Sequence, residues 1–500
     1  MKLRVSIFLL IVVLGISCRK NPEEGDYISR SHQALLKFKR SHRIPGFAFA
    51  IFDSKDTLLT VCMGKSNLGF AINEETIFSL QSISKNITAL AVMKAVQDSL
   101  LDLDTPISEY LPGFTVNSCF ESKPEDKITL RMLLSHTAGF THEAPVGNNY
   151  DYTPCATDEH MESISETWLK FPVGSDYSYS NLGFDLASSI VAKAAGKDFD
   201  AYLKSELFLP LGMRSTTSNQ SEVAQNPNRT DGHIPHVKSK HYPIPLPGSG
   251  AVYSSLSDMI KYTQLLMNYG KSNPGSLIEE QALMEMFTII DNHYGLGSYM
   301  DTRENRFYIN HNGGGFGYAA TLVWYPEYEI GSVLLSNKYC NTFDICISLM
   351  NAYIQDRDME KDSRVTESFK ALNGPDFQGK GSLKHKARAC SGETTFKPEW
   401  EEYLGKYYLD IKGMKVRWYV KVANFFGMGK QKFWIDKEEQ SLIITNSRGE
   451  SELREFEPGL FFTDDYEVVD FRIEKVTFRN IGTTKKENWK MPELFKDAEN

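Results

Sequence analysis

The chain of 500 residues is longer than one ordinary domain, since single hydrophobic cores stop growing near about 250–300 residues. With 41% hydrophobic and 24% charged residues, its composition excludes a wholly disordered chain, a fibrous repeat and a polytopic membrane protein. Acidic residues outnumber basic ones by 64 to 55, which gives a net charge of −9 without any long basic run. This balance argues against a nucleic-acid partner.

The N-terminus has the pattern of an export signal. Lys2 and Arg4 precede an apolar run over residues 5–16, and small residues follow it. The run is shorter than the ~20 apolar residues that cross a bilayer, so we predict a cleaved signal peptide at residues 1–17. The polar residues 18–27 are predicted to form a flexible tether.

Residues 15–18, with the sequence Gly-Ile-Ser-Cys, resemble a bacterial lipobox, in which the cysteine is the acylated first residue of a lipoprotein. We therefore expect Cys18 to carry a lipid anchor. The protein would then be exported, as a periplasmic or outer-membrane-anchored lipoprotein of a bacterium. In the alternative, plain signal cleavage removes Cys18 with the signal peptide.

Six further cysteines permit up to three disulfides in an exported protein, but the sequence selects no pairing. Buried free thiols are an equally good interpretation of them. They are Cys62, Cys119, Cys155, Cys340, Cys346 and Cys390. No C-x-x-C pair occurs, so neither a zinc ribbon nor a thioredoxin-type site is indicated.

Residues 28–356 alternate between strand-like and helix-like stretches. Two apolar runs of strand length, 47–52 and 57–62, predict a hairpin. A strand at 76–80 leads into a helical pattern over 82–100, where apolar residues recur at i and i+4 without Gly or Pro. The later elements are predicted as helices at 181–195 and 256–269 and strands at 306–309, 318–325 and 330–335. The mixture predicts an α/β (α+β) catalytic domain, with helices packed on an antiparallel sheet.

The residue pattern changes after a charged connector at 357–395. Residues 396–500 contain short aromatic and β-branched runs punctuated by Gly and Asn, which predict a small all-β barrel or sandwich. The runs are 403–411, 416–422, 433–435, 441–445, 460–463 and 468–476.

Ser82 and Lys85 form an S-x-x-K motif. Residues three apart share one face of a helix, so the serine hydroxyl and the lysine amine can lie within hydrogen-bond reach. A serine hydroxyl is a weak nucleophile, and a lysine whose pKa is lowered by burial can act as its base. The motif alone is weak, because residues 17–20 match it too. Ser82 differs because it follows a strand and opens a helix, where the backbone N–H groups carry partial positive charge.

Tyr179 and Asn181 form a Y-x-N motif that also occurs at 308–310 and 339–341. The first copy leads into a predicted helix, which exposes the tyrosine at a loop edge. A phenol beside a lysine ammonium is more readily ionised, so Tyr179 could take the serine proton and return it to the leaving group. In the alternative, Tyr179 is an aromatic residue packed under a loop.

His311 ends a predicted strand and is followed by a glycine-rich stretch over residues 313–317. Glycines let the backbone approach a ligand closely. An N–H group from this edge, paired with that of Ser82, could hold the oxyanion of a tetrahedral intermediate. The alternative is a tight glycine hairpin with a surface histidine.

The order of these three motifs resembles that of the penicillin-recognising serine hydrolases. Class A enzymes carry S-D-N as the middle motif, which is missing here, so the chain looks like the class C β-lactamase, D,D-peptidase and esterase branch. The resemblance covers about residues 44–349. Its further segments are residues 44–48, 76–82, 101–107, 128–139 and 248–254. The region that begins at 403–407 is similar to the lipocalin-like domain of some members.

The resemblance implies a role for each motif residue. Ser82 would attack an amide or ester carbonyl and form an acyl-enzyme, while Lys85 and Tyr179 relay protons. Asn181 would orient the substrate amide. His136 is typical of the family and is expected to be structural.

The third motif is implied to bind substrate through His311, Gly313 and Gly314, with the Gly314 N–H completing the oxyanion hole. His311 stands where true β-lactamases usually carry lysine. Histidine is mostly neutral above pH ~6.5 and should grip a substrate carboxylate less firmly. This departure favours peptide or ester substrates over penicillins.

His233, His236 and His241 form a small histidine cluster of the kind that can bind a metal. Their segment is Pro-rich and loop-like, without a carboxylate at helical spacing or an H-E-x-x-H motif, so a solvated loop is favoured and no metal or cofactor is expected.

Two functions remain open at this level. The favoured one is an exported serine hydrolase whose partners are a membrane lipid anchor and a small-molecule or peptide substrate with an amide or ester carbonyl. The alternative is a non-catalytic envelope protein that binds or senses penicillin in the same cleft. The intact set of Ser82, Lys85 and Tyr179 favours the enzyme. Substrate choice, which depends on loops such as 143–162 and 218–247, and the oligomeric state are not predicted.

Overall fold

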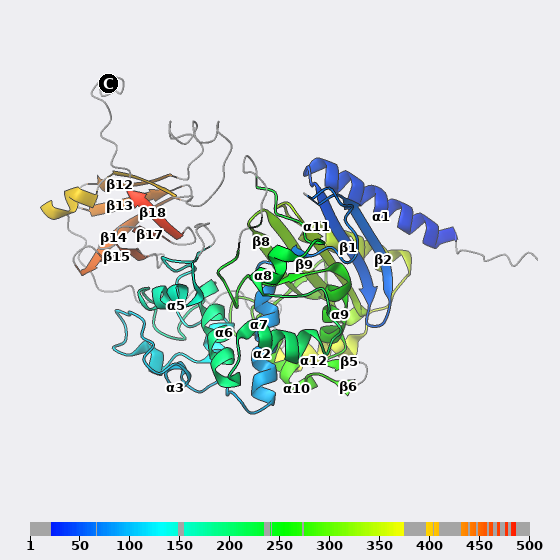
Figure 1. Ribbon diagram of the computed structural model, residues 1–500, viewed down its shortest axis with the longest axis horizontal. Helices are drawn as coiled ribbons and strands as arrows, with labels where there is room; N and C mark the ends of the chain where they lie inside the picture. The colour runs from blue at the N-terminus through cyan, green and yellow to red at the C-terminus, as the bar shows by residue number, and fades with distance from the viewer. Residues whose placement is uncertain are drawn as a thin grey trace, which may run out of the picture.

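The computed structural model describes two parts of the chain (Figure 1). The first is residues 22–374, apart from 67, 149–154, 235–240, 242 and 273–274. The second is residues 397–403 followed by a series of strands between 405 and 486. Cys18 and the predicted signal peptide lie outside the described residues, so the export prediction is untested.

Six strands of the first part form one antiparallel sheet in the order β2-β1-β10-β9-β8-β7. The strands are β1 Gly46–Asp53, β2 Thr57–Gly64, β7 Tyr299–Arg303, β8 Arg306–Gly315, β9 Tyr318–Tyr325 and β10 Ile330–Ser336. The predicted hairpin and the last three predicted strands are confirmed. β8 runs farther than expected because Gly313 and Gly314 continue its pairing with β9, opposite Ala320 and Ala319.

Helices cover both faces of this sheet. The longer helices are α1 Pro22–Ser41, α2 Ile83–Gln97, α5 Thr157–Ser165, α6 Asn181–Ala195, α9 Leu256–Met267, α11 Phe343–Asp356 and α12 Ser363–Asn373. The shorter helices are α3 Ile107–Tyr110, α4 Leu130–Leu134, α7 Phe199–Leu203, α8 Gln220–Gln225 and α10 Glu280–Met286. Short strand pairs are β3 Phe78–Ser79 with β4 Tyr253–Ser254, and β5 Lys271–Ser272 with β6 Gly275–Ser276. The expected α/β arrangement is thus present.

The alternation of side chains along β1 explains the two layers. Phe47 and Phe49 join the core that also contains residues of α1 and α11. Ala48 and Ala50 point to the opposite face and join the larger core around α2. Most residues of α2 are buried, the polar Ser84, Lys85, Asn86 and Thr88 among them, and Figure 1 shows the helix running through the middle of the helical part.

The N-terminal boundary differs from the prediction. Helix α1 begins at Pro22, inside the stretch 18–27 that we expected to be a flexible tether. The reason is an apolar stripe that starts at Tyr27, whose ring is buried and whose hydroxyl donates to the carbonyl of Leu349 in α11 at 3.0 Å. Among the described helices, none is both long and apolar enough to span a bilayer.

The predicted connector at 357–395 also differs in its first part, which contains α12. Phe369 of α12 is buried, and its ring lies 4.8 Å from that of Phe307 and 6.4 Å from that of Phe287. This helix is therefore packed on the first part of the chain. Residues 375–396 lie outside the described residues.

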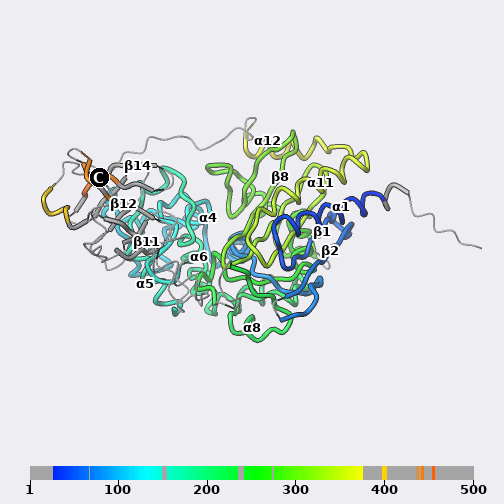
Figure 2. Tube along the Cα trace, turned by 90° about the horizontal axis from the view of Figure 1, so that it is seen from above, coloured from blue at the N-terminus to red at the C-terminus, as the bar shows by residue number. Residues whose placement is uncertain are grey.

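The strands of the second part form one antiparallel sheet in the order β16-β15-β14-β13-β12-β11-β18-β17. They are β11 Gly405–Leu409, β12 Lys432–Glu438, β13 Ser441–Asn446, β14 Gly449–Glu457, β15 Leu460–Thr463, β16 Val468–Asp470, β17 Val476–Phe478 and β18 Gly482–Lys486. The sequence predicted neither β14 nor β18, and its run 468–476 covers β16 but only the first residue of β17. The predicted strand 416–422 lies outside the described residues. Closure into a barrel and the lipocalin-like resemblance stay predictions. Seen from above, α1 lies beside α11, and α5 lies on the far side of α6 from them (Figure 2).

The cysteines fall into more than one state. Cys119 is disulfide-bonded, whereas Cys62, Cys340 and Cys346 are free thiols. Cys390 lies outside the described residues.

Candidate active site

Ser82 stands at the N-cap of α2, directly after a strained residue. Gln81 has a φ of +50°, a left-handed conformation that is uncommon for a residue with a side chain. Its side-chain amide donates to the hydroxyl of Ser79 in β3 at 2.7 Å, which fixes the turn between strand and helix. The turn leaves Ser82 half-buried, at the positive end of the helix.

Lys85 lies one turn into α2 and is completely buried. Its Nζ atom is 3.2 Å from the Ser82 hydroxyl oxygen, 2.6 Å from Oδ1 of Asn181 and 3.1 Å from the carbonyl oxygen of Ser249. The last two partners can only accept, so they hold two N–H groups of the lysine. A neutral amine in this position turns its lone pair toward the Ser82 hydroxyl.

The electrostatics of the pocket favour that neutral amine. Burial lowers the pKa of Lys85 to about 7, although the negative charges of Asp185 and Glu143 oppose the shift. At neutral pH a substantial fraction of Lys85 is therefore able to accept a proton.

Tyr179 completes the group around the nucleophile. The Lys85 Nζ lies 4.9 Å from the centre of its ring, and its hydroxyl is hydrogen-bonded to Ser82. Burial raises the pKa of Tyr179, and the bond to Ser82 offsets only part of that rise. The expectation of an easily ionised phenol was wrong, because removal from water outweighs the nearby lysine.

His136 has a structural role, as expected. Its Nδ1 atom accepts the backbone N–H of Ser180 at 3.1 Å, and its ring lies 4.3 Å from the ring of Tyr179. Burial lowers the pKa of His136 well below its ordinary value. The imidazole is thus a neutral platform under the Tyr179 loop.

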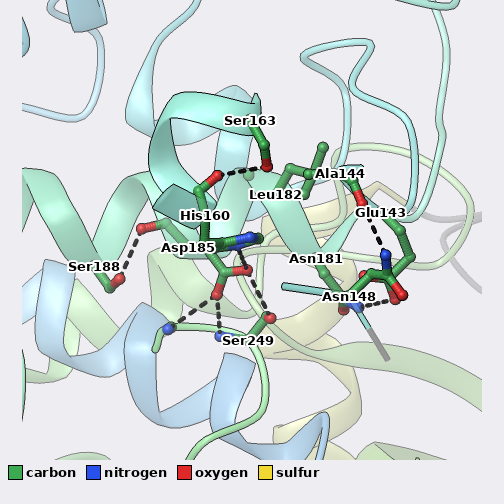
Figure 3. Close-up of polar contacts among 12 residues, drawn as sticks. Glu143, Ala144, Asn148, His160, Ser163, Asn181, Leu182, Asp185, Ser188 and Ser249 are labelled. Atoms are coloured by element: carbon green, nitrogen blue, oxygen red, sulfur yellow. Dashed lines mark hydrogen bonds and ion pairs between the residues drawn. The ribbon is translucent and has the colours of Figure 1, made fainter. Parts of the chain in front are cut away.

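Asn181, the first residue of α6, is fixed at both ends of its amide. Oδ1 accepts from Lys85. Nδ2 donates to Oε1 of Glu143 at 2.7 Å (Figure 3). Glu143 is 2% exposed and also lies 3.1 Å from Nδ1 of His142. The sequence did not point to this carboxylate, because a single Glu in an irregular loop belongs to no spacing pattern.

His311 is brought to the same site but is not a surface residue. It is 1% exposed, with Nδ1 2.8 Å from the carbonyl of Asn312 and Nε2 3.1 Å from the hydroxyl of Tyr294. Nδ1 must carry the hydrogen, because its partner is a carbonyl, and Nε2 then accepts from the tyrosine. Burial, together with the charge of Lys85, lowers the pKa of His311 to about 3. Both nitrogens are occupied and the ring is neutral.

The glycines after His311 permit a close approach of β8 to the nucleophile turn. A Cβ on Gly313 would lie 2.0 Å from the carbonyl oxygen of Leu80, two residues before Ser82. A Cβ on Gly314 would lie 2.5 Å from the ring of Tyr339, which is 68% exposed. The three sequence motifs therefore meet at one place, as their order predicted.

The histidines weighed as a metal site do not form one among the residues described. His233 uses Nδ1 to contact the carbonyl of Asn337 at 3.1 Å, and His236 lies outside the described residues. No cluster of three or more His, Cys, Asp or Glu side chains suited to a metal occurs in the described part of the chain.

Comparison with known proteins agrees with this geometry. A protein-family model described as Beta-lactamase matches residues 31–344. The chain is 26% identical over 293 residues to a penicillin-binding protein of Bacillus subtilis (strain 168), covering 53% of this chain and 62% of that protein. It is 27% identical over 291 residues to the D-alanyl-D-alanine-carboxypeptidase/endopeptidase AmpH of Escherichia coli (strain K12), covering 53% of this chain and 71% of that protein.

The match thus spans less than two thirds of the Bacillus relative. Among solved structures, the octameric penicillin-binding protein homologue from Pyrococcus abyssi aligns with a TM-score of 0.55 and 18% identity. The alignment covers 90% of this chain and 95% of that one. At this identity the likeness concerns the fold alone.

Proposed function

Because the chain belongs to the beta-lactamase family, we propose that it is a serine hydrolase that cleaves ester or amide bonds through a covalent acyl-enzyme on Ser82. The observation that carries the proposal is the contact between Ser82 and Lys85. A buried amine with a lowered pKa stands 3.2 Å from the hydroxyl of a serine at a helix N-terminus. This is the arrangement that turns a weak nucleophile into an effective one.

In the acylation step, the Ser82 hydroxyl oxygen attacks the substrate carbonyl while its proton passes to Lys85. The carbonyl oxygen becomes an oxyanion, which the backbone N–H groups of Ser82 and Gly314 stabilise in the proposed mechanism. Collapse of the tetrahedral intermediate breaks the bond to the leaving alkoxide or amine. Tyr179 gives that group its hydroxyl proton and regains one from Lys85.

Deacylation repeats the sequence with water as the nucleophile. Water attacks the ester carbonyl of the acyl-enzyme, and its proton passes to the Lys85 and Tyr179 pair. The second collapse breaks the bond between the acyl carbon and the Ser82 oxygen, and the serine recovers its proton. The raised pKa keeps Tyr179 protonated near neutral pH, so it still holds the proton that the leaving group needs, and Lys85 acts as the general base.

The state of His311 supports a substrate without a carboxylate next to the scissile bond. A neutral ring whose nitrogens are occupied by Tyr294 and Asn312 has no charge to offer such a group. Beside it, the hydroxyls of Tyr177 and Tyr299 lie 3.0 Å apart. The rings of both tyrosines pack against the ring of Tyr294. We therefore favour esters, and peptides without a carboxylate beside the scissile bond, over β-lactams as substrates.

A fluorophosphonate probe and a substrate panel test this proposal. The panel is p-nitrophenyl esters, nitrocefin and a D-Ala-D-Ala peptide. Labelling should be lost in Ser82→Ala and retained in Ser255→Ala, which removes the capping serine of α9 instead. Turnover of at least one ester or peptide is expected. Fluorophosphonate labelling that survives in Ser82→Ala overturns the proposal. Permanent acylation of Ser82 by a compound of the panel, without turnover of any of them, supports a sensor in its place.

The proposed location is an exported lipoprotein anchored through Cys18. This part is supported by the sequence pattern of residues 1–18 alone. A bacterial culture that expresses the full chain and is fed an alkynyl fatty acid should incorporate the label. Cys18→Ser should abolish incorporation, and equal labelling of the variant would overturn the anchor.

A further inference from the structure

Asp185 is a buried carboxylate that the proposed chemistry does not use. It is 0% exposed and lies on α6 one turn after Asn181, the residue that contacts Lys85 directly. A carboxylate is costly to remove from water unless donors surround it. Its partners therefore show what its burial achieves.

The carboxylate holds the loop that precedes β4 (Figure 3). Oδ1 accepts the backbone N–H groups of Gly248 and Ser249 at 3.0 and 2.9 Å, and Oδ2 accepts the Ser249 hydroxyl at 3.1 Å. Gly248 lies so close to α6 that a Cβ there would be 2.0 Å from the carbonyl oxygen of Phe184. The loop is thus pressed onto the helix and fixed by three hydrogen bonds to one side chain.

The same loop contacts the general base. The carbonyl oxygen of Ser249 accepts from the Lys85 Nζ at 3.1 Å. The lysine therefore has two acceptors that both depend on α6, one from Asn181 itself and one from the loop that Asp185 holds. Movement of the Asp185 side chain would release the second acceptor.

His160 of α5 fixes Asp185 from the other side. Its Nε2 atom lies 3.1 Å from Oδ2 of Asp185, and its Nδ1 atom lies 2.8 Å from the carbonyl oxygen of Val146. Both neighbours are acceptors, so the protonated imidazolium satisfies both at once. Burial alone would lower the pKa of His160, but the hydrogen bond to Asp185 and its charge raise it above the ordinary value. The two side chains form a buried ion pair.

We propose that Asp185, held by His160, is a positioning residue that fixes the Ser249 carbonyl and through it the side chain of Lys85. The inference rests on the proposed function, since it assigns Lys85 as the base. Asp185 also places a negative charge near Lys85, which His160 partly cancels. The pair therefore influences both where the amine points and how readily it is protonated.

Other ionisable groups face Lys85 as well. They are Glu143 from the loop before α5, Tyr179 from the loop before α6, His136 after α4, and His311 from β8. The tyrosine and the two histidines are neutral near pH 7, because burial raises the pKa of the first and lowers the pKa of the others. Glu143 is unchanged in the variants below, so it does not affect the difference between them.

The test is the pH dependence of kcat/KM for a p-nitrophenyl ester in Asp185→Asn and His160→Gln. Loss of the negative charge makes Lys85 easier to deprotonate, so the acid limb of Asp185→Asn should move to lower pH. Loss of the positive charge leaves Asp185 uncancelled, so the limb of His160→Gln should move to higher pH. We expect shifts of about half a pH unit or more, or about threefold in rate on the limb.

Asp258→Asn is the matched control. Asp258 is another buried carboxylate that accepts a backbone N–H, that of Ser215 at 2.7 Å, but it lies on α9 and does not contact the Lys85 group. Its variant should keep the wild-type limb. A purely structural role for Asp185 would lower the rate of its variant without moving the limb, and that result overturns the inference.

Shifts of both variants in the same direction would overturn it as well. If Asp185→Asn does not fold by circular dichroism, the direction of the His160→Gln shift decides. Failure of the proposed function is recognised separately, because Ser82→Ala would then keep the hydrolysis and the fluorophosphonate labelling.

Discussion

The amine nitrogen of Lys85 lies 3.2 Å from the hydroxyl oxygen of Ser82, inside a pocket that excludes water from the lysine. Lys85 can accept the serine proton only in its neutral form. With a pKa of about 7, kcat/KM for an uncharged ester should fall tenfold per pH unit below pH 7 and level off above it. A stopped assay over pH 5 to 9 checks this. A rate that still rises tenfold per pH unit between pH 8 and 9 would contradict the lowered pKa.

Lys85→Arg separates charge from basicity at the same position. A guanidinium stays protonated throughout this range and cannot accept the proton, so we expect a loss of about 10²-fold or more in kcat/KM. Lys94→Arg, on the same helix and paired with Asp98, should keep wild-type activity. Comparable activity in Lys85→Arg would remove the lysine from the mechanism.

His311→Lys should give the site a cation for carboxylate-bearing substrates. A charge-assisted hydrogen bond contributes about 1.5–3 kcal/mol, so the variant should improve kcat/KM for an acid over its methyl ester by about tenfold or more. His311→Gln, which stays neutral, is the control and should leave the ratio near its wild-type value. Steady-state kinetics with the substrate pair measures it. An unchanged ratio in His311→Lys would mean that the carboxylate lies elsewhere.

The two glycines that follow should differ sharply in their tolerance of a methyl group. Gly313→Ala meets the backbone carbonyl of Leu80, which cannot move without disturbing the nucleophile turn. We expect a loss of about 1–3 kcal/mol in stability and most of the activity. Gly314→Ala meets the exposed ring of Tyr339, which can rotate away, so its cost should be small.

Thermal unfolding and ester hydrolysis of both variants check the contrast. Equal behaviour of Gly313→Ala and Gly314→Ala would show that β8 does not press on the turn before Ser82.

The parts of the site that the sequence predicted are those with local patterns. Helix α6 was predicted at its observed bounds because Ser180 caps it, accepting from the N–H of Leu182, and Gly196 ends it with a φ of +63°. The S-x-x-K spacing likewise determined that Lys85 and Ser82 share one face of α2. These signals act within one or two helical turns.

The contacts that the sequence could not predict join residues through tertiary packing. His160 and Asp185 lie on different helices, and neither belongs to a motif, yet their side chains are 3.1 Å apart. The buried His311 ring is hydrogen-bonded to Tyr294, which belongs to none of the sequence motifs. The pKa of Tyr179 is raised because the fold removes its hydroxyl from water. Such properties arise from the packed pocket and have no counterpart in residue spacing.

Helix α12 was not predicted, because the charged residues around it have the pattern of a connector. Its packing leads to the final prediction. Phe369 lies against the rings of Phe287 and Phe307, and Oδ1 of Asn373 accepts the N–H of Ile289 at 2.6 Å. Phe369→Ala should therefore lower the free energy of unfolding by about 3 kcal/mol or more, whereas Glu367→Ala on the exposed face should have little effect.

Truncation gives the same prediction a second readout. A chain that ends after residue 374 keeps α12 and should retain Ser82-dependent ester hydrolysis, because its two apolar cores stay covered. A chain that ends after residue 357 uncovers Phe287 and Phe307 and should unfold at lower temperature or aggregate. Equal melting temperatures of the two truncated chains would show that α12 contributes nothing to the catalytic unit. The expected difference would place the end of that unit at α12, beyond the boundary at residue 356 that the charge pattern suggested.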